Sequence, residues 1–331
     1  RKAHLANEDF PSAINILERF NKIDLWNDNR DEIVDFIKLN DHNTNKISNY
    51  LCEYVQVISI CHYLLERCCF TVIQPTDENW AFDMFQSLNA TGTPLTAIET
   101  FKPRVVNVTE EFGNGFKNSK NEEFFNKIDK LFEDVDTAQQ KNTRTKDYLT
   151  SFFVAYNGQQ VSSHFSHQRK SLIDAFEDRK DINKQIDFIK KSSFVEFLGN
   201  YAEFYKSIWL ASDKNMTSPF SVLNGLEEAD LATMLIRFLR ASNHKMAITV
   251  LGNFYDSIQR GRTNAAEDFI KAVKAVSAYY FLWRSSASNA GLDVTYRDLF
   301  KTDDKTWKFE NGITIIELKS HLKAKLRDKQ I

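Results

Sequence analysis

Three side chains that can bind phosphate or sugar oxygens lie close together in the sequence, around one predicted turn. Asn89 and Thr91 belong to the stretch Asn-Ala-Thr-Gly-Thr-Pro, and Lys102 follows in the next predicted helix. Amide, hydroxyl and ammonium groups donate hydrogen bonds to such oxygens. The free backbone amides at the start of a helix favour anions as well. The stretch is therefore a candidate cradle for a phosphate or another anion.

The same stretch also has a purely structural interpretation. Gly92 lies where a helix ending near Leu88 needs a left-handed residue, and Pro94 directs the chain toward the next helix. Thr96 and Glu99 have the spacing of a capping box, in which each side chain accepts a hydrogen bond from the backbone amide of the other residue. This interpretation needs no ligand, but it does not explain the asparagine, the threonine before the glycine, or the lysine.

Elsewhere the sequence offers little catalytic chemistry. His164 and His167 have the i, i+3 spacing that can place two imidazoles on one helix face, but zinc needs a third ligand and none is near. We therefore predict no metal site and interpret both histidines as surface or hydrogen-bonding residues. His62 follows Cys61 directly, and adjacent helical residues do not face each other, so the two cannot form a catalytic pair.

Basic residues recur in three stretches that could contact DNA phosphates: RFLR with NHK, QRGR at residues 259–262, and HLKAKLRDK near the C-terminus. In the last stretch, leucines at every fourth position predict a packed face opposite the charges. The candidate DNA contacts there are Lys319, Lys323, Lys325 and Arg327. Solvated helix faces often carry such runs, so DNA contact and simple solvation both remain open.

The composition is that of a helix-rich globular protein. The 331 residues suffice for one large or two ordinary domains, and 42% of them are apolar. The 43 basic and 45 acidic residues nearly cancel, so net charge does not support a protein that coats nucleic acid. No apolar run reaches membrane-spanning length, so no membrane span is predicted.

The chain has four cysteines and no CxxC pair: Cys52, Cys61, Cys68 and Cys69. This pattern predicts buried free thiols in a reducing cytosol.

Apolar residues recur at helical spacing along most of the chain. The pattern predicts a long amphipathic helix over residues 43–68, an aromatic helix that stops at Asn157–Gly158, and a basic helix after a Thr314–Glu317 capping box. The β-branched and aromatic stretch CCFTVIQP, residues 68–75, predicts one short strand.

The stretch FDMFQSLNATGTPLTAIETFK, residues 82–102, resembles the signature F-x-x-x-N-x-x-G-x-x-L-x-x-x-[DE]-x-x-K of the GmrSD-type restriction endonucleases, which are anti-phage proteins of bacteria and archaea. The matching residues are Phe85, Asn89, Gly92, Leu95, Glu99 and Lys102. AYYFLWRSSASNAGLDVTYRDLF, residues 278–300, is similar to a later helical segment of that family. FFVAYNGQQVSSHFSHQRKSLIDAF, residues 152–176, is a weaker third match.

The resemblance implies a nucleotide-dependent DNA restriction factor, a hydrolase of antiviral defence in the cytoplasm. In that family a ParB-like domain with a DGQQR motif binds and hydrolyses a nucleoside triphosphate with Mg²⁺, and an HNH-type nuclease domain cuts DNA. Neither motif occurs here. The sequence has no DGQQR, since NGQQ at residues 157–160 follows the signature instead of preceding it, and it has no His-centred nuclease motif. The chain is therefore expected to be a piece of a longer protein or a degenerate relative, and to be inactive alone.

The expected fold is mainly α. Residues 1–110 would be the C-terminal remnant of a ParB-like α+β domain, and residues 111–331 a multi-helix domain leading toward a nuclease domain or subunit. Asn89, Thr91, Gly92 and Lys102 would line the nucleotide site, and the basic C-terminal helix would contact DNA. The alternative is a non-catalytic helical interaction module in which the Asn-Ala-Thr-Gly turn is only structural.

Overall fold

The computed structural model describes residues 11–19, 29–40, 45–69, 95–112, 115–178, 183–211, 220–286, 291–304 and 306–329. Every long regular element in these ranges is a helix, and no β-strand occurs within them. The prediction of a mainly α protein is therefore confirmed. The predicted strand over residues 68–75 lies almost wholly outside the described residues.

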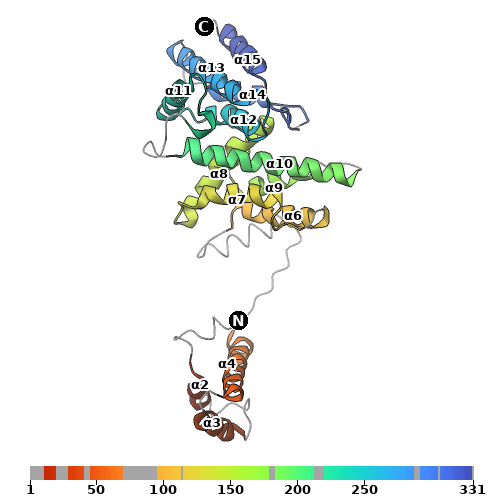
Figure 1. Cartoon of the computed structure of the whole chain (residues 1–331), viewed down its shortest axis with the longest axis vertical. Coiled ribbons are helices and arrows are strands. Elements are labelled where there is room, and N and C mark those ends of the chain that lie inside the picture. The colour runs from red at the N-terminus through yellow and green to blue at the C-terminus, as the bar shows by residue number, and fades with distance from the viewer. Residues whose placement is uncertain are drawn as a thin grey trace. The chain divides into compact units, whose positions relative to one another are not determined.

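The chain divides into two compact units, Arg1–Gln74 and Pro75–Ile331. The first unit contains α2 (Ala13–Arg19), α3 (Arg30–Leu39) and α4 (Lys46–Arg67), which are drawn in red and orange in Figure 1. α4 is the predicted long amphipathic helix. It begins where the Asn45 side chain accepts hydrogen bonds from two free backbone amides of the first turn.

One side of α4 forms the small core of the first unit. Val55 is buried there with residues of α2 and α3, namely Ala13, Ile16, Leu17, Val34 and Ile37. The four cysteines are free, but Cys61 and Cys69 are exposed and Cys52 and Cys68 are only half-buried. The expectation of buried thiols is wrong, because α2 and α3, the other described helices of this unit, pack against only one side of α4.

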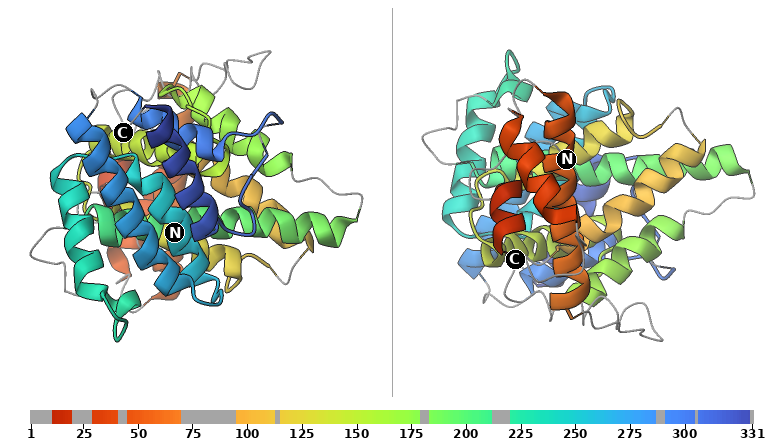
Figure 2. Two further views of the ribbon diagram at one scale, coloured as in Figure 1. Left: turned by 90° about the horizontal axis from the view of Figure 1, so that it is seen from above. Right: turned by 90° about the horizontal axis from the view of Figure 1, so that it is seen from below.

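The second unit is built around α10 (Lys184–Phe204), which runs through its middle in Figure 1. On one side lie α6 (Ala97–Phe112), α7 (Lys120–Asp129), α8 (Ala138–Asn157) and α9 (Phe165–Glu177). On the other lie α11 (Ala229–Ala241), α12 (Ala247–Gln259), α13 (Ala265–Ser286), α14 (Leu292–Phe300) and α15 (Ile315–Asp328). α13 and α15 lie side by side, as the view from above in Figure 2 shows.

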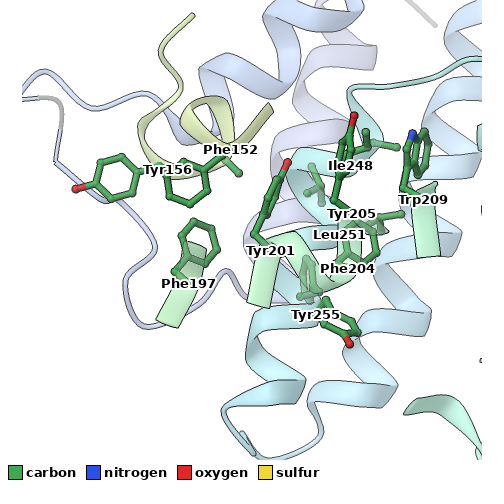
Figure 3. Packing of buried hydrophobic residues seen from close by; sticks show 14 of the residues in the cluster. Phe152, Tyr156, Phe197, Tyr201, Phe204, Tyr205, Trp209, Ile248, Leu251 and Tyr255 are labelled. Carbon is green, nitrogen blue, oxygen red and sulfur yellow. The ribbon is translucent and has the colours of Figure 1, made fainter. Parts of the chain in front are cut away.

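Aromatic side chains fill the space between α8, α10 and α12, as Figure 3 shows. Phe152 of α8 packs edge to face against Tyr201 of α10, with ring centroids 5.8 Å apart. Such pairs add to the free energy of burying their surface. The helix α12 approaches closely because it carries Gly252, where an added Cβ would stand 2.4 Å from the Tyr201 ring. The core thus fixes where each helix of the second unit lies.

Three helix ends follow the predicted local rules. Thr96 and Glu99 form the capping box of α6, and Thr314 and Glu317 form that of α15. α8 ends at Gly158, which has the left-handed φ of 72°. α6 ends close to the domain boundary predicted at residue 110, but it packs against α9 and lies within the second unit.

Candidate functional site

The signature stretch lies only partly within the described residues. Asn89, Thr91 and Gly92, three of the four predicted nucleotide-binding residues, fall outside them. The described part begins at Leu95 and includes the first two turns of α6, with Lys102. The geometry of the candidate nucleotide site is therefore described from Leu95 to Lys102.

Glu99 is held by bonds within the protein. One carboxylate oxygen accepts a hydrogen bond from Thr96 N at 2.7 Å, and the other pairs with Lys141 Nζ at 2.5 Å. Burial raises the pKa of this carboxyl, but the bonds from Lys141 and from the Thr96 amide outweigh burial, and the net pKa is lowered. Glu99 thus stays ionised as a helix cap and an inter-helix ion pair, as the structural interpretation of the turn requires.

Lys102 lies one turn further along α6. Its ammonium group pairs with Asp129 Oδ2 of α7 at 2.9 Å and lies 5.4 Å from the centre of the Phe125 ring. The side chain is still 36% exposed. It borders an open pocket of about 370 Å³ along α6, which Glu99 and Asn107 also line. Lys102 can therefore reach a ligand in this pocket, at the cost of its bond to Asp129.

The predicted DNA contacts lie on α15, and the structure divides them into two groups. Lys319, Lys323 and Arg327 are exposed, recur every fourth residue, and have no ion-pair partner among the described residues. Lys325 instead pairs with Asp298 Oδ2 of α14 at 2.7 Å. We call the first three the α15 ridge. The leucines predicted to pack do so, since Leu318 and Leu322 are buried and Leu326 is partly buried against the core.

The arginines of the other two basic stretches are engaged within the fold. Arg260 of the QRGR stretch lies between α10 and α12, where it pairs with Asp256 Oδ2 and Glu196 Oε2, each at 2.7 Å. Arg240 of RFLR donates a hydrogen bond to the Ala211 carbonyl oxygen. These arginines are used inside the fold, whereas Lys245 of the NHK stretch is exposed, so DNA contact by these stretches stays a prediction.

The two histidines singled out in the sequence border a pocket that the sequence did not reveal. The rings of His164 and His167 lie 5.9 Å apart, and His167 lines a pocket of about 390 Å³ between the end of α8 and α9. Lys170, Asp174 and Asp178 also line it. Since charges of both signs share its rim, the pocket has no net attraction for an anion such as phosphate.

No group of three His, Cys, Asp or Glu side chains in the described part of the chain could hold a metal ion. Within the same ranges, no helix combines the length and apolar composition needed to cross a bilayer. No family model matches the sequence, and no curated protein matches it significantly.

Proposed function

We propose that this chain is part of a nucleotide-dependent DNA restriction protein that resembles the GmrSD-type endonucleases, in which nucleotide binding is coupled to DNA cleavage. The observation that carries the proposal is the signature from Phe85 to Lys102. In this proposal the first part of the chain is the remnant of a ParB-like domain, and a nuclease domain or subunit completes the activity. A nucleoside triphosphate with Mg²⁺ is the ligand of the parent protein.

The position of Lys102 supports a nucleotide site at the start of α6. An exposed ammonium group next to an open pocket suits phosphate oxygens. In this proposal Asn89, Thr91 and Gly92 approach the same ligand from the preceding turn. Lys102 pairs with Asp129, so in this proposal phosphate and Asp129 compete for one ammonium group.

Substitutions of opposite effect test the nucleotide site. Lys102→Ala and Asn89→Ala should each weaken ATP and GTP binding, measured by isothermal titration calorimetry with Mg²⁺. Asp129→Asn should strengthen binding, because it frees the ammonium group. Lys130→Ala is the matched control, since it removes an exposed charge nearby without touching the pocket. Equal affinities in all four variants would exclude a nucleotide site at α6.

The alternative function, a non-catalytic interaction module, has its own supporting observation. Glu99 and Lys102 both have partners inside the protein, so the signature charges have a structural role without any ligand. An interaction module also needs a surface for a partner, and the first unit offers one on α4. In that case the purified chain binds a protein and no nucleotide.

A further inference from the structure

α4 carries a second apolar face that α2 and α3, the other described helices of its unit, leave uncovered. The first face is centred on Val55 and packs against α2 and α3. The side chains of the second face recur at alternating steps of three and four residues. They are Ile47, Tyr50, Tyr54, Val57, Cys61 and Leu64. We call this set the α4 stripe.

The α4 stripe is solvent-exposed over its whole length. Ile47 is 67% exposed, Tyr50 64%, Tyr54 62%, and Val57 and Leu64 44% each. Cys61 is exposed as well. The stripe contains no charged residue, and the adjoining Leu65 is 81% exposed. A contiguous apolar surface of this kind marks an interaction site in a folded protein.

The spacing of the stripe defines the kind of partner that fits it. Steps of three and four residues place apolar side chains along the seam between two helices, where each side chain enters a gap in the facing helix. The matching surface is therefore another helix with the same spacing. We propose that this partner is α4 of a second copy of the chain, packed antiparallel to the first.

The charges beside the stripe favour a second copy of α4 as the partner, and they favour one alignment of the two antiparallel helices. Glu53 and Arg67 lie on the same edge of the stripe, and neither has an ion-pair partner among the described residues. A two-fold axis near Ser59 places Tyr54 against Leu64 of the partner subunit and Glu53 beside Arg67 of the partner subunit. The symmetry repeats this ion pair on the other side.

The neighbouring register is disfavoured by its charges. If Ile47 faced Leu64 of the partner subunit, Lys46 would lie beside Arg67 of the partner subunit, and these like charges would repel each other. The edge charges therefore favour the register centred near Ser59. A parallel pair would leave the same edge charges without partners.

The area of the stripe suits a modest dimer. In the register centred near Ser59, only the part of the stripe from Tyr54 to Leu64 faces its counterpart within α4. A buried tyrosine can cover on the order of 200 Å², so the exposed fractions of this part and of Leu65 give roughly 400 Å² per copy, against about 800 Å² per partner in a standard interface. We therefore infer a weak, reversible dimer that forms at high protein concentration.

Analytical ultracentrifugation of the full chain tests the proposal. The wild type should pass from monomer to dimer at roughly 10–500 μM, as expected of a small, transient interface. Tyr54→Glu combined with Val57→Glu should be monomeric throughout, with unchanged circular dichroism. The control Asn49→Glu adds a charge on the polar side of α4 and should leave the dimer intact.

Charge reversal identifies the partner as a second copy. Glu53→Arg and Arg67→Glu should each weaken self-association about tenfold, since each places two like-charge pairs at the edges. An equimolar mixture of the two variants should associate as tightly as the wild type, because opposite charges then meet again. If the mixture stays as weak as its components, the antiparallel register is wrong.

A wild type that stays monomeric at all concentrations overturns the dimer. If Tyr54→Glu then also lowers the melting temperature, another part of the same chain covers the stripe. A dimer that survives the double substitution in the stripe equally overturns the proposal, because its interface then lies elsewhere.

Discussion

Among single residues, His244 shows how strongly burial changes the chemistry of a side chain. Its ring stacks on Tyr280 with centroids 4.3 Å apart, and Nε2 lies 2.8 Å from the Tyr296 hydroxyl. Burial, together with the smaller effect of the Arg284 charge, lowers the pKa of His244 to about 4. The ring is therefore neutral in the folded protein at pH values where it is half-protonated in the unfolded chain.

This difference predicts a pH-dependent stability. Between pH 6.5 and about 4 the unfolded chain binds a proton at His244 that the folded protein does not. The free energy of unfolding should therefore be highest above pH 6.5 and fall by up to about 3 kcal/mol as the pH drops through this window. His244→Gln should flatten this fall in urea denaturation curves recorded at several pH values. The exposed His164→Gln should not change it, and a loss of stability toward high pH would contradict the assignment.

At the scale of helices, two features lead to predictions: the C-terminal end of α8 and the exposed surface of α15. Gly158 closes α8 with a φ of 72°, and a Cβ there would stand 2.5 Å from the Arg297 carbonyl oxygen of α14. Gly261 has a similar φ of 65° but no atom within 4 Å of an added Cβ. The two glycines separate backbone strain from steric overlap.

Gly158→Ala should destabilise the protein more than Gly261→Ala. Positive φ alone costs a residue with a side chain about 1 kcal/mol. We therefore expect about 1 kcal/mol at position 261 and roughly 3 kcal/mol at position 158, where α8 and α14 must also move apart. Chemical denaturation of both variants measures the difference. Equal losses would mean that the contact between Gly158 and α14 is not tight.

The α15 ridge gives a second prediction at this scale. If the ridge contacts DNA phosphates, replacing Lys319, Lys323 and Arg327 with Gln should weaken binding to duplexes of any sequence. The slope of the logarithm of the binding constant against the logarithm of the salt concentration should become less steep by up to about 3. Lys325→Gln should leave binding almost unchanged, because this lysine is paired with Asp298. Fluorescence anisotropy at several salt concentrations distinguishes the two variants. Equal effects of both would place the contact elsewhere.

At the scale of the whole molecule, buried charges tie the helices of the second unit together. Arg260 of the α12 end pairs with Asp256 and Glu196 and donates a hydrogen bond to the Ser193 carbonyl oxygen at 3.0 Å. Asn200 donates a hydrogen bond to the other Asp256 oxygen at 2.9 Å. The network joins α10 to α12 and encloses the Asp256 carboxylate, which is only 4% exposed and has little access to water if a partner is lost.

Breaking this network should cost far more than breaking a surface pair. Arg260→Ala leaves Asp256 buried without a counter-ion and should lower the free energy of unfolding by about 3 kcal/mol or more. Lys274→Ala removes the partner of Glu228 in an exposed pair and should cost at most about 1 kcal/mol. Urea denaturation compares the two. Similar losses would show that Arg260 is hydrated in solution.

The sequence by itself determined the helical class, the long helix α4, and the ends of α6, α8 and α15. These features depend on residues within four or five positions of one another, such as Thr96 with Glu99 or Asn157 with Gly158. Periodicity and capping are local, so one sequence contains all that they need. The face of α15 that packs was predictable for the same reason.

Only the tertiary structure decided which charges are available to a ligand. Lys102 and Asp129 are 27 residues apart in the chain, as are Lys325 and Asp298, and Arg260 and Ser193 are 67 apart. No local pattern predicts such partners, so a paired lysine and a solvated one look alike in the sequence. The same holds for the thiols of Cys52 and Cys61, whose exposure depends on how many helices pack around α4. Which side chains face a partner is decided by the packing of distant helices, because burial is a property of the whole fold.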